Sequence, residues 1–111
     1  MRLDELLESS IDVVKAAEHL ARQHGVEVTL EADGPRKLDL TWLERTRGSK
    51  GSGGKFLADL IRLADQHHCQ IMLAVWDGEP KLVALYQKFG FEVIDAGQEG
   101  EDPIMLRQPS T

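Results

Sequence analysis

The sequence predicts a single α/β domain with a mixed, mostly antiparallel central sheet flanked by helices. Three observations support this class. The 111 residues suit one domain. Hydrophobic residues make up 41% of the chain and charged residues 29%, which is ordinary for a globular protein. Helical and strand periodicities follow one another in the order α-β-β-α-β-α-β-β.

The first half of the chain predicts a helix and a hairpin. Apolar residues recur at helical spacing from residue 3 to about 23. Ser9 or Ser10 is an alternative helix cap, so a break near these residues remains open. Residues 26–31 and 37–44 alternate as two strands, and the turn residues between them predict an antiparallel hairpin.

The second half predicts two helices and three strands. A helix is expected over about residues 52–67, followed by a largely apolar strand at residues 70–76. A short helix follows over residues 81–89, where Pro80 is placed for its first turn. Residues 91–94 and 103–107 complete the pattern as strands.

One basic, glycine-rich segment interrupts an acidic chain. The 13 basic and 19 acidic residues give a net charge of −6, which disfavours a nucleic-acid or anionic-membrane binder. Residues 45–55 read RTRGSKGSGGK and lie between a predicted strand and a predicted helix. The free amides of a helix N-terminus and the local cations therefore predict a phosphate-binding loop rather than a flexible linker. The cations are Arg45, Arg47, Lys50 and Lys55, and the glycines are Gly48, Gly51, Gly53 and Gly54.

Two common phosphate motifs do not fit this loop. A P-loop ending at Lys55 would have Ser49 in place of its first glycine and Phe56 in place of its magnesium-binding hydroxyl. A dinucleotide fingerprint laid on Gly51 and Gly53 would need a small residue at Phe56. Neither a nucleoside triphosphate nor a dinucleotide is therefore the expected ligand.

The loop and a second motif together resemble the GNAT superfamily of Gcn5-related N-acetyltransferases. In that family a loop of the pattern Q/R-x-x-G-x-G/A binds the pyrophosphate of acetyl-CoA. Gly51-Ser52-Gly53 matches the G-x-G, whereas Gly48 stands at the Q/R position. The run LYQKFGFE at residues 85–92 is close to the family's LYxKxGFE signature, and PIMLRQ resembles its final strand.

The resemblance implies a GNAT-like acyl-CoA N-acyltransferase fold, with acetyl-CoA as cosubstrate and no metal. It covers about residues 26–107 of a single domain of residues 1–111, with residues 1–25 as a reduced helical N-terminal segment. It also implies that the strand before the loop splays from the strand at residues 70–76 and binds the pantetheine arm through its backbone. The implied cofactor-binding residues are Trp42, Leu43, Glu44, Arg45, Arg47, Gly48, Lys50, Gly51, Ser52, Gly53, Gly54 and Lys55.

The implied reaction is direct attack of an amine on acetyl-CoA in a ternary complex. Tyr86, the one tyrosine of the chain, occupies the family's general-acid position and would protonate the departing thiolate. Packing on its helix face is the structural alternative for Tyr86. An ammonium has a pKa of about 10.4, so a base must remove its proton. Asp39 and Glu44 are the candidate bases, and strand alternation places them on opposite faces, so at most one faces the substrate.

The acceptor is expected to be an amine, either a small molecule or a protein lysine or N-terminus, and neither nucleic acid nor membrane is expected as a partner. A homodimer could cover an exposed sheet edge. Two other classes of function remain open on the same fold: a non-catalytic acyl-CoA-binding module, and a protein-interaction or regulatory module.

The cysteine content predicts a cytoplasmic protein. Cys69 is the one cysteine, which excludes an internal disulfide framework and suits a reducing compartment. The opening residues MRLDELLESS are acidic, unlike a secretory signal. A metal site at His67-His68-Cys69 is disfavoured, because adjacent side chains at a helix end diverge.

Overall fold

The helices and strands follow one another in the order that the sequence predicts. The computed structural model describes the backbone of residues 3–45, 51–75, 78–98 and 100–109, and the side chains of residues 3–9, 42–45 and 52 lie outside this description. The elements are α1 (Leu3–His24), β1 (Val26–Ala32), β2 (Lys37–Arg45), α2 (Ser52–Gln66), β3 (Gln70–Ala74), α3 (Pro80–Lys88), β4 (Glu92–Asp95) and β5 (Ile104–Arg107). The predicted order α-β-β-α-β-α-β-β is confirmed.

The strands of the described chain form one mixed sheet, in the order β1-β2-β3-β5-β4. β2 and β3 run parallel, and every other neighbouring pair is antiparallel. The β1–β2 pair is the predicted hairpin, and α2 provides the crossover that the parallel pair requires. The predicted mixed, mostly antiparallel sheet is therefore confirmed.

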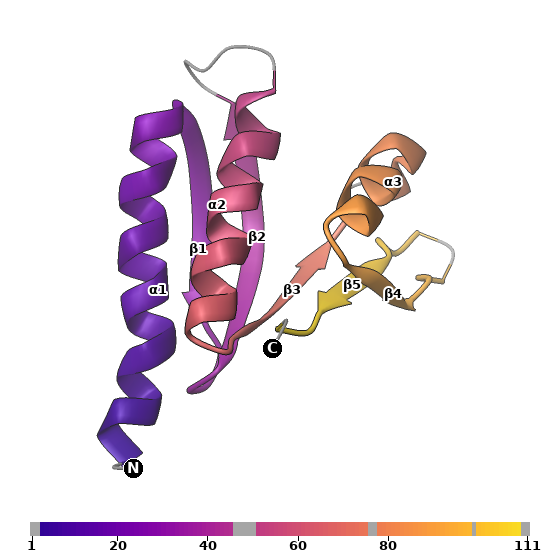
Figure 1. The fold of residues 1–111 in the computed structure, drawn as a ribbon. Helices are drawn as coiled ribbons and strands as arrows, with labels where there is room; N and C mark the ends of the chain where they lie inside the picture. Colours follow the sequence, from indigo (N-terminus) through magenta and orange to yellow (C-terminus); the bar gives the residue numbers. More distant parts are fainter. Residues whose placement is uncertain (1–2, 46–50, 76–77, 99, 110–111) are drawn as a thin grey trace.

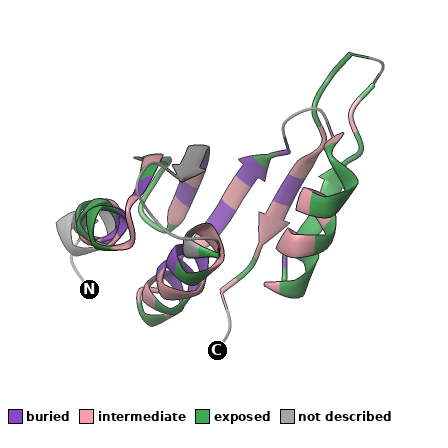
Figure 2. Cartoon of the chain, turned by 90° about the horizontal axis from the view of Figure 1, so that it is seen from above, coloured by how far each residue is buried: buried purple, intermediate pink, exposed green. Residues whose placement is uncertain are grey.

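The hydrophobic core lies between the sheet and the helices α1 and α2. These two helices contact each other and the strands, and Figures 1 and 2 show them side by side over one face of β1 and β2. Leu38 and Leu40 in β2 are buried opposite Ile71 and Leu73 in β3. The helices add the buried side chains Val13, Ala17, Ala21, Phe56, Leu57, Leu60, Ile61 and Ala64.

α1 is one continuous amphipathic helix of 22 residues. Val13, Ala17 and Ala21 are buried at helical spacing, whereas Lys15 and Glu18 are exposed on other sides of the helix. The open alternative of a second helix capped near residue 10 is not realised, because α1 runs without interruption. No described helix combines the length and the apolar character that crossing a membrane requires.

Ser10 joins α1 to the turn of the hairpin. Its side chain is buried, and its hydroxyl donates a hydrogen bond of 2.6 Å to the carbonyl oxygen of Gly34. A buried hydroxyl without an acceptor would be unfavourable, so this bond explains a serine on the apolar face of the helix.

Replacing Ser10 by alanine should lower the free energy of unfolding by about 1 kcal/mol, because the hydrogen bond to Gly34 is lost at a buried position. Urea unfolding measures this change. Lys15→Ala, at an exposed position of the same helix, is the control and should change the value by less than about 0.5 kcal/mol. Equal losses in the two variants would contradict the assigned role.

Candidate functional site

The parallel strands β2 and β3 are paired at one end and separate at the other. Their pairing extends from Lys37 and Gln70 to Leu40 and Leu73, whereas β2 itself continues to Arg45. Figure 1 shows β3 turning away from β2 beyond the paired part. We call this arrangement the β2–β3 fork. The splay that the family resemblance implies is thus confirmed.

A bulge in β2 lies where the fork opens. Leu30 of β1 is paired with Leu40, and the preceding Thr29 is paired with Trp42, so Thr41 is an extra residue in β2. The hydroxyl of Thr41 donates to the carbonyl oxygen of Thr29 at 3.2 Å. A bulge bends a strand and increases its twist, and this bulge lies directly after the last residue of β2 that is paired with β3. In the sequence, Trp42 continues the alternation of Leu38 and Leu40 whereas Leu43 breaks it, so periodicity alone does not decide whether a residue is inserted.

The extra residue also changes the relation between the two candidate bases. Asp39 is paired with Glu31 and Glu44 with Glu27, and these two partners share one face of β1. Positions 39 and 44 therefore belong to the same face of the sheet. The expectation of opposite faces is wrong, because it assumed uninterrupted alternation. The side chain of Glu44 is outside the described residues.

Asp39 occupies an unfavourable position for a charged carboxylate. Its Oδ1 atom is buried, and no hydrogen-bond partner for it is found among the described residues. Burial raises the pKa of the Asp39 carboxyl, the neighbouring charge of Asp33 raises it further, and Lys37 opposes the change. A carboxylate with a raised pKa accepts a proton more readily near neutral pH, as a general base must.

The first turn of α2 begins after a glycine and has no side-chain cap. Gly51 is the N-cap residue, has a left-handed backbone with φ of +92°, and makes no side-chain cap. A Cβ atom added at Gly51, Gly53 or Gly54 would meet no described atom within 4 Å. Packing within the described chain therefore does not require glycine at positions 53 and 54, where glycine costs about 1 kcal/mol relative to alanine in a helix. Among the described residues, no atom fills the space beside these glycines, at a helix end with positive partial charge.

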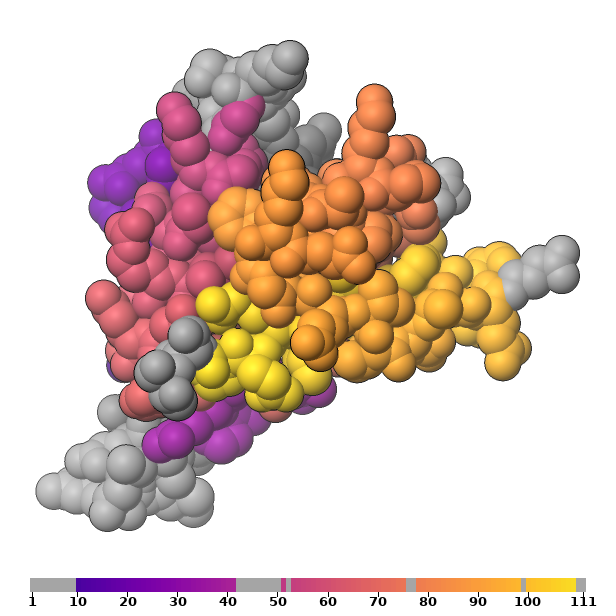
Figure 3. All heavy atoms as spheres, turned by 45° about the vertical axis from the view of Figure 1, so that its right-hand side comes forward, coloured from indigo at the N-terminus to yellow at the C-terminus, as the bar shows by residue number. Residues whose placement is uncertain are grey.

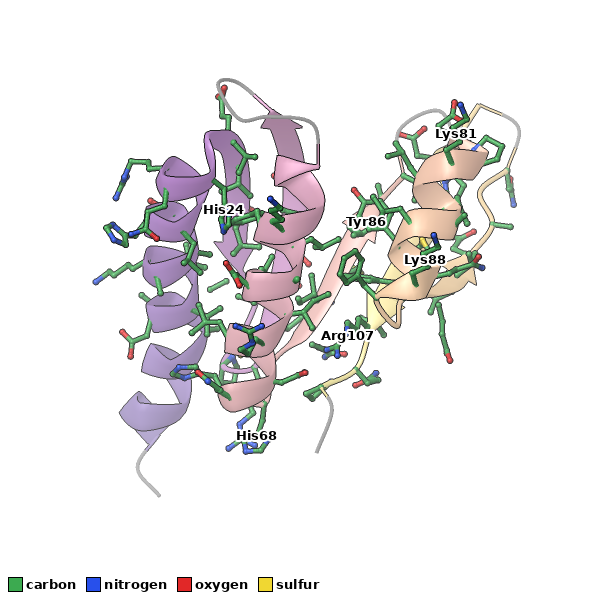
Figure 4. The ribbon with its side chains drawn as sticks, turned by 45° about the horizontal axis from the view of Figure 1, so that its top comes forward. His24, His68, Lys81, Tyr86, Lys88 and Arg107 are labelled. Carbon is green, nitrogen blue, oxygen red and sulfur yellow. The ribbon has the colours of Figure 1, made fainter. Side chains whose placement is uncertain are left out.

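α2 and α3 both begin at the open end of the fork, as Figures 1 and 4 show. Each helix follows one of the parallel strands, α2 after β2 and α3 after β3. Pro80 occupies the first turn of α3, and the Glu79 side chain caps it by accepting from the Lys81 amide at 3.3 Å. Ligands of open α/β sheets bind at the carboxyl ends of such strands.

Tyr86 lies on α3 and is partly buried against the core. Its ring makes an edge-to-face contact with the buried Phe91, with 5.6 Å between the ring centroids. Figure 4 shows Tyr86 on the side of α3 that faces β3. Burial raises the pKa of the phenol, so the hydroxyl keeps its proton at neutral pH. The packing role is therefore realised, and it is compatible with a role as proton donor.

The predicted cofactor-binding residues are only partly described. Arg47, Gly48 and Lys50 lie outside the described residues, as do the side chains of Trp42, Leu43, Glu44, Arg45 and Ser52. Of the remaining four, Gly51, Gly53 and Gly54 line the start of α2, and Lys55 is exposed in its first turn. Within the described part of the chain, no three His, Cys, Asp or Glu residues are grouped as metal ligands would be.

No family model matches the sequence, and no curated protein matches it closely enough to serve as a relative. Solved structures do match. Ard1 from Thermoplasma volcanium has a TM-score of 0.62 and 11% identity, and the match covers 100% of this chain and 95% of that one. A GNAT family acetyltransferase from Elizabethkingia anophelis, with acetyl-CoA bound, has a TM-score of 0.58 and 15% identity. This match covers 97% of this chain and 90% of that one. The chain has the GNAT fold.

A longer GNAT structure matches only in part. Naa50 from Arabidopsis thaliana, in complex with the bisubstrate analogue CoA-Ac-MVNAL, has a TM-score of 0.57 and 20% identity, and the match covers 75% of this chain. The chain spans 63% of the Naa50 chain and between 47% and 58% of three further matches. At these identities the likeness is one of fold alone.

Replacing Asp39 by asparagine should raise the melting temperature at neutral pH. The folded-state pKa of Asp39 is raised, so the fold is penalised when this carboxyl ionises, and the penalty grows as pH rises through the folded pKa. The gain should shrink as pH falls toward about 3, below the unfolded-state pKa of 3.8, where the carboxyl becomes largely protonated in both states. Thermal unfolding at both pH values measures it. Asp12→Asn, at an exposed position of α1, should leave the melting temperature nearly unchanged.

Proposed function

We propose that this chain transfers the acetyl group of acetyl-CoA to an amine by direct attack in a ternary complex. One observation carries the proposal: the open end of the β2–β3 fork and the glycine-lined start of α2 lie at the same end of the sheet. These two features suit the two parts of coenzyme A, an extended arm with amide groups and a pyrophosphate. Acetyl-CoA carries both parts, and it is bound to the Elizabethkingia anophelis acetyltransferase that shares this fold, which supports the proposal.

The pantetheine arm would bind along β2. Beyond Leu40 the pairing with β3 stops, so on that side the backbone of residues 41–45 has no β3 partner in the described chain. Backbone N–H and C=O groups need hydrogen-bond partners, and the amides of an extended ligand provide them in the geometry of an added strand. The bulge at Thr41 keeps this edge of β2 available by bending it away from β3.

The pyrophosphate would bind at the start of α2. The amides of the first helical turn carry positive partial charge, and Gly53 and Gly54 allow an anion to approach the backbone closely. Lys55 is exposed in this turn, and we include Arg45, Arg47, Lys50 and the backbone at Gly48 in the proposed site. A chain of net charge −6 needs such local cations to hold an anionic ligand.

The proposed chemistry needs a base, an oxyanion donor and an acid. Bound acetyl-CoA supplies the thioester. Glu44, which lies beyond the part of β2 that is paired with β3, or Asp39, which lies within it, accepts the proton of the amine, directly or through water, so that nitrogen can form its bond to the acetyl carbon. Backbone N–H groups of residues 42–44 stabilise the negative charge that develops on the carbonyl oxygen. As the carbon–sulfur bond breaks, Tyr86 gives its hydroxyl proton to the leaving sulfur.

The acceptor class is an amine, and a peptide N-terminus is the first candidate to test. Naa50, which shares the fold, was solved with an analogue that links CoA to the peptide MVNAL. The acidic surface of this chain would also attract a cationic acceptor such as a lysine side chain or a polyamine. A panel of one unmodified peptide, one N-blocked lysine peptide and spermidine distinguishes these acceptors by release of free CoA thiol.

Replacing Gly53 by alanine should separate stability from ligand binding. A helical alanine is favoured over glycine by up to about 1 kcal/mol, and the added Cβ meets no described atom, so the ligand-free fold should become more stable. Acetyl-CoA affinity should fall at least about tenfold, because the methyl group occupies space needed by the phosphate. Urea unfolding and calorimetric titration measure the two effects.

Ala58, in the next turn of α2, provides the matched control for this experiment. Ala58→Gly should destabilise the helix by about 1 kcal/mol and leave the affinity for acetyl-CoA unchanged. Undiminished affinity in the Gly53→Ala variant would refute the assignment of the phosphate site.

Replacing Tyr86 by phenylalanine should lower kcat by about 100-fold and leave the dissociation constant for acetyl-CoA unchanged. Phenylalanine keeps the ring contact with Phe91, so the melting temperature should change little. Thiol release and calorimetric titration measure the two constants. A kcat equal to that of the unmodified chain would transfer the acid role to water.

A further inference from the structure

Arg107, the last residue of β5, joins the two helices that begin at the open end of the fork. Its guanidinium forms a two-pronged ion pair with Asp65 in the last turn of α2, at 2.7 and 3.1 Å. Its Nε atom donates to the carbonyl oxygen of Phe89, the C-cap residue of α3, at 2.7 Å. Figure 4 shows Arg107 between the ends of α2 and α3.

These bonds lie at the closed end of the fork. Arg107 is paired with Ile71 in β3, and Ile71 is paired with Leu38 in β2, within the part where the two strands are still together. The contacts on the helices fall at their C-terminal ends, whereas both helices begin at the open end. Arg107 therefore holds α2 and α3 together at the end opposite to the proposed ligand site.

α3 depends on polar bonds more than α2 does. Every residue of α3 keeps some exposure, and Leu82, Val83 and Tyr86 are only partly buried against the core. Arg107 itself is only 11% exposed, so its charge-assisted bonds are shielded from water. Figure 3 shows the surface of α3 beside that of α2, where such bonds can fix their relative direction.

A glycine of the LYQKFGFE run makes room for this arrangement. Gly90 has a left-handed backbone with φ of +93°, and a Cβ atom there would lie 3.3 Å from the Nε atom of Arg107. The glycine allows the turn after α3 to close directly over the guanidinium. The end of α3 and the position of Arg107 are thus coupled by geometry as well as by hydrogen bonds.

We propose that Arg107 is a positioning residue for acetyl transfer, which sets the direction of α3 and so the position of Tyr86 relative to the start of α2. This role rests on the proposed function. The guanidinium bonds to Asp65 and Phe89 and acts on the reaction through Tyr86. A displacement of about 1 Å in a reacting group can cost about 100-fold in rate, so a small rotation of α3 matters.

The first test compares Arg107→Met and Arg107→Lys with the unmodified chain. Methionine removes all the guanidinium bonds, whereas lysine keeps the charge but not the planar fork. We expect kcat to fall by about 10- to 100-fold in Arg107→Met and by less in Arg107→Lys. The dissociation constant for adenosine 3′,5′-bisphosphate, the nucleotide part of CoA, should change by less than about twofold, because this probe reaches only the proposed phosphate end of the site.

The decisive readout is a double-mutant cycle with Tyr86→Phe. If Arg107 acts through Tyr86, Arg107→Met should lower kcat by less than about threefold once the tyrosine hydroxyl is gone. If Arg107→Met lowers kcat by the same factor in the unmodified chain and in the Tyr86→Phe variant, the positioning role is overturned, because the loss would then indicate general structural damage. If Arg107→Met does not fold, the same cycle with Arg107→Lys decides.

A matched control breaks a different side-chain hydrogen bond of α2. Asp59 accepts from His24 of α1 at 2.7 Å, on another side of the helix. Asp59→Asn should lower the melting temperature and leave kcat unchanged. If the unmodified chain binds neither acetyl-CoA nor adenosine 3′,5′-bisphosphate, the proposed function fails and the positioning role fails with it. If both ligands bind but Arg107→Met lowers kcat by the same factor with and without the Tyr86 hydroxyl, only the positioning role is overturned.

Discussion

The short parallel pairing between β2 and β3 is the constraint on which the rest of the structure depends. After Leu40 and Leu73 the two strands are no longer paired, and the bulge at Thr41 lies where this pairing stops. A sheet that stayed paired along the whole of β2 would saturate its backbone groups and leave none for a ligand. Because the strands separate, β2 and β3 form fewer hydrogen bonds with each other, and the part of β2 beyond Leu40 becomes an edge inside the sheet.

The two sides of the fork are stabilised in different ways. On one side, α1 and α2 cover β1 and β2 and bury a continuous set of side chains that includes Phe56 and Leu60. On the other side of the fork, α3 contributes only partly buried residues, and the buried side chains include Phe91 and Met105. Less apolar burial means a smaller hydrophobic contribution, so the bonds of Arg107 to Asp65 and Phe89 carry more of the attachment.

The start of α2 likewise contains residues that lower the local stability of the helix. Gly53 and Gly54 are poor helix formers, and nothing described nearby needs their small size. The helix forms nevertheless, because its later turns bury Phe56, Leu57 and Leu60. Tertiary packing of the body of the helix therefore allows an end that is suited to an anion rather than to helix propensity.

The sequence by itself determined the elements, their order and the glycine-rich composition at the start of α2, because periodicity and glycine content are local properties. Tertiary structure alone decided which residues meet. The bulge at Thr41 changes the face of every residue after it, yet Trp42 and Leu43 are both apolar, so the sequence does not show which of them keeps the inward-facing alternation. The bond from Arg107 to Asp65 spans 42 residues and that from Ser10 to Gly34 spans 24, and such contacts depend on how the elements pack, which no local pattern records.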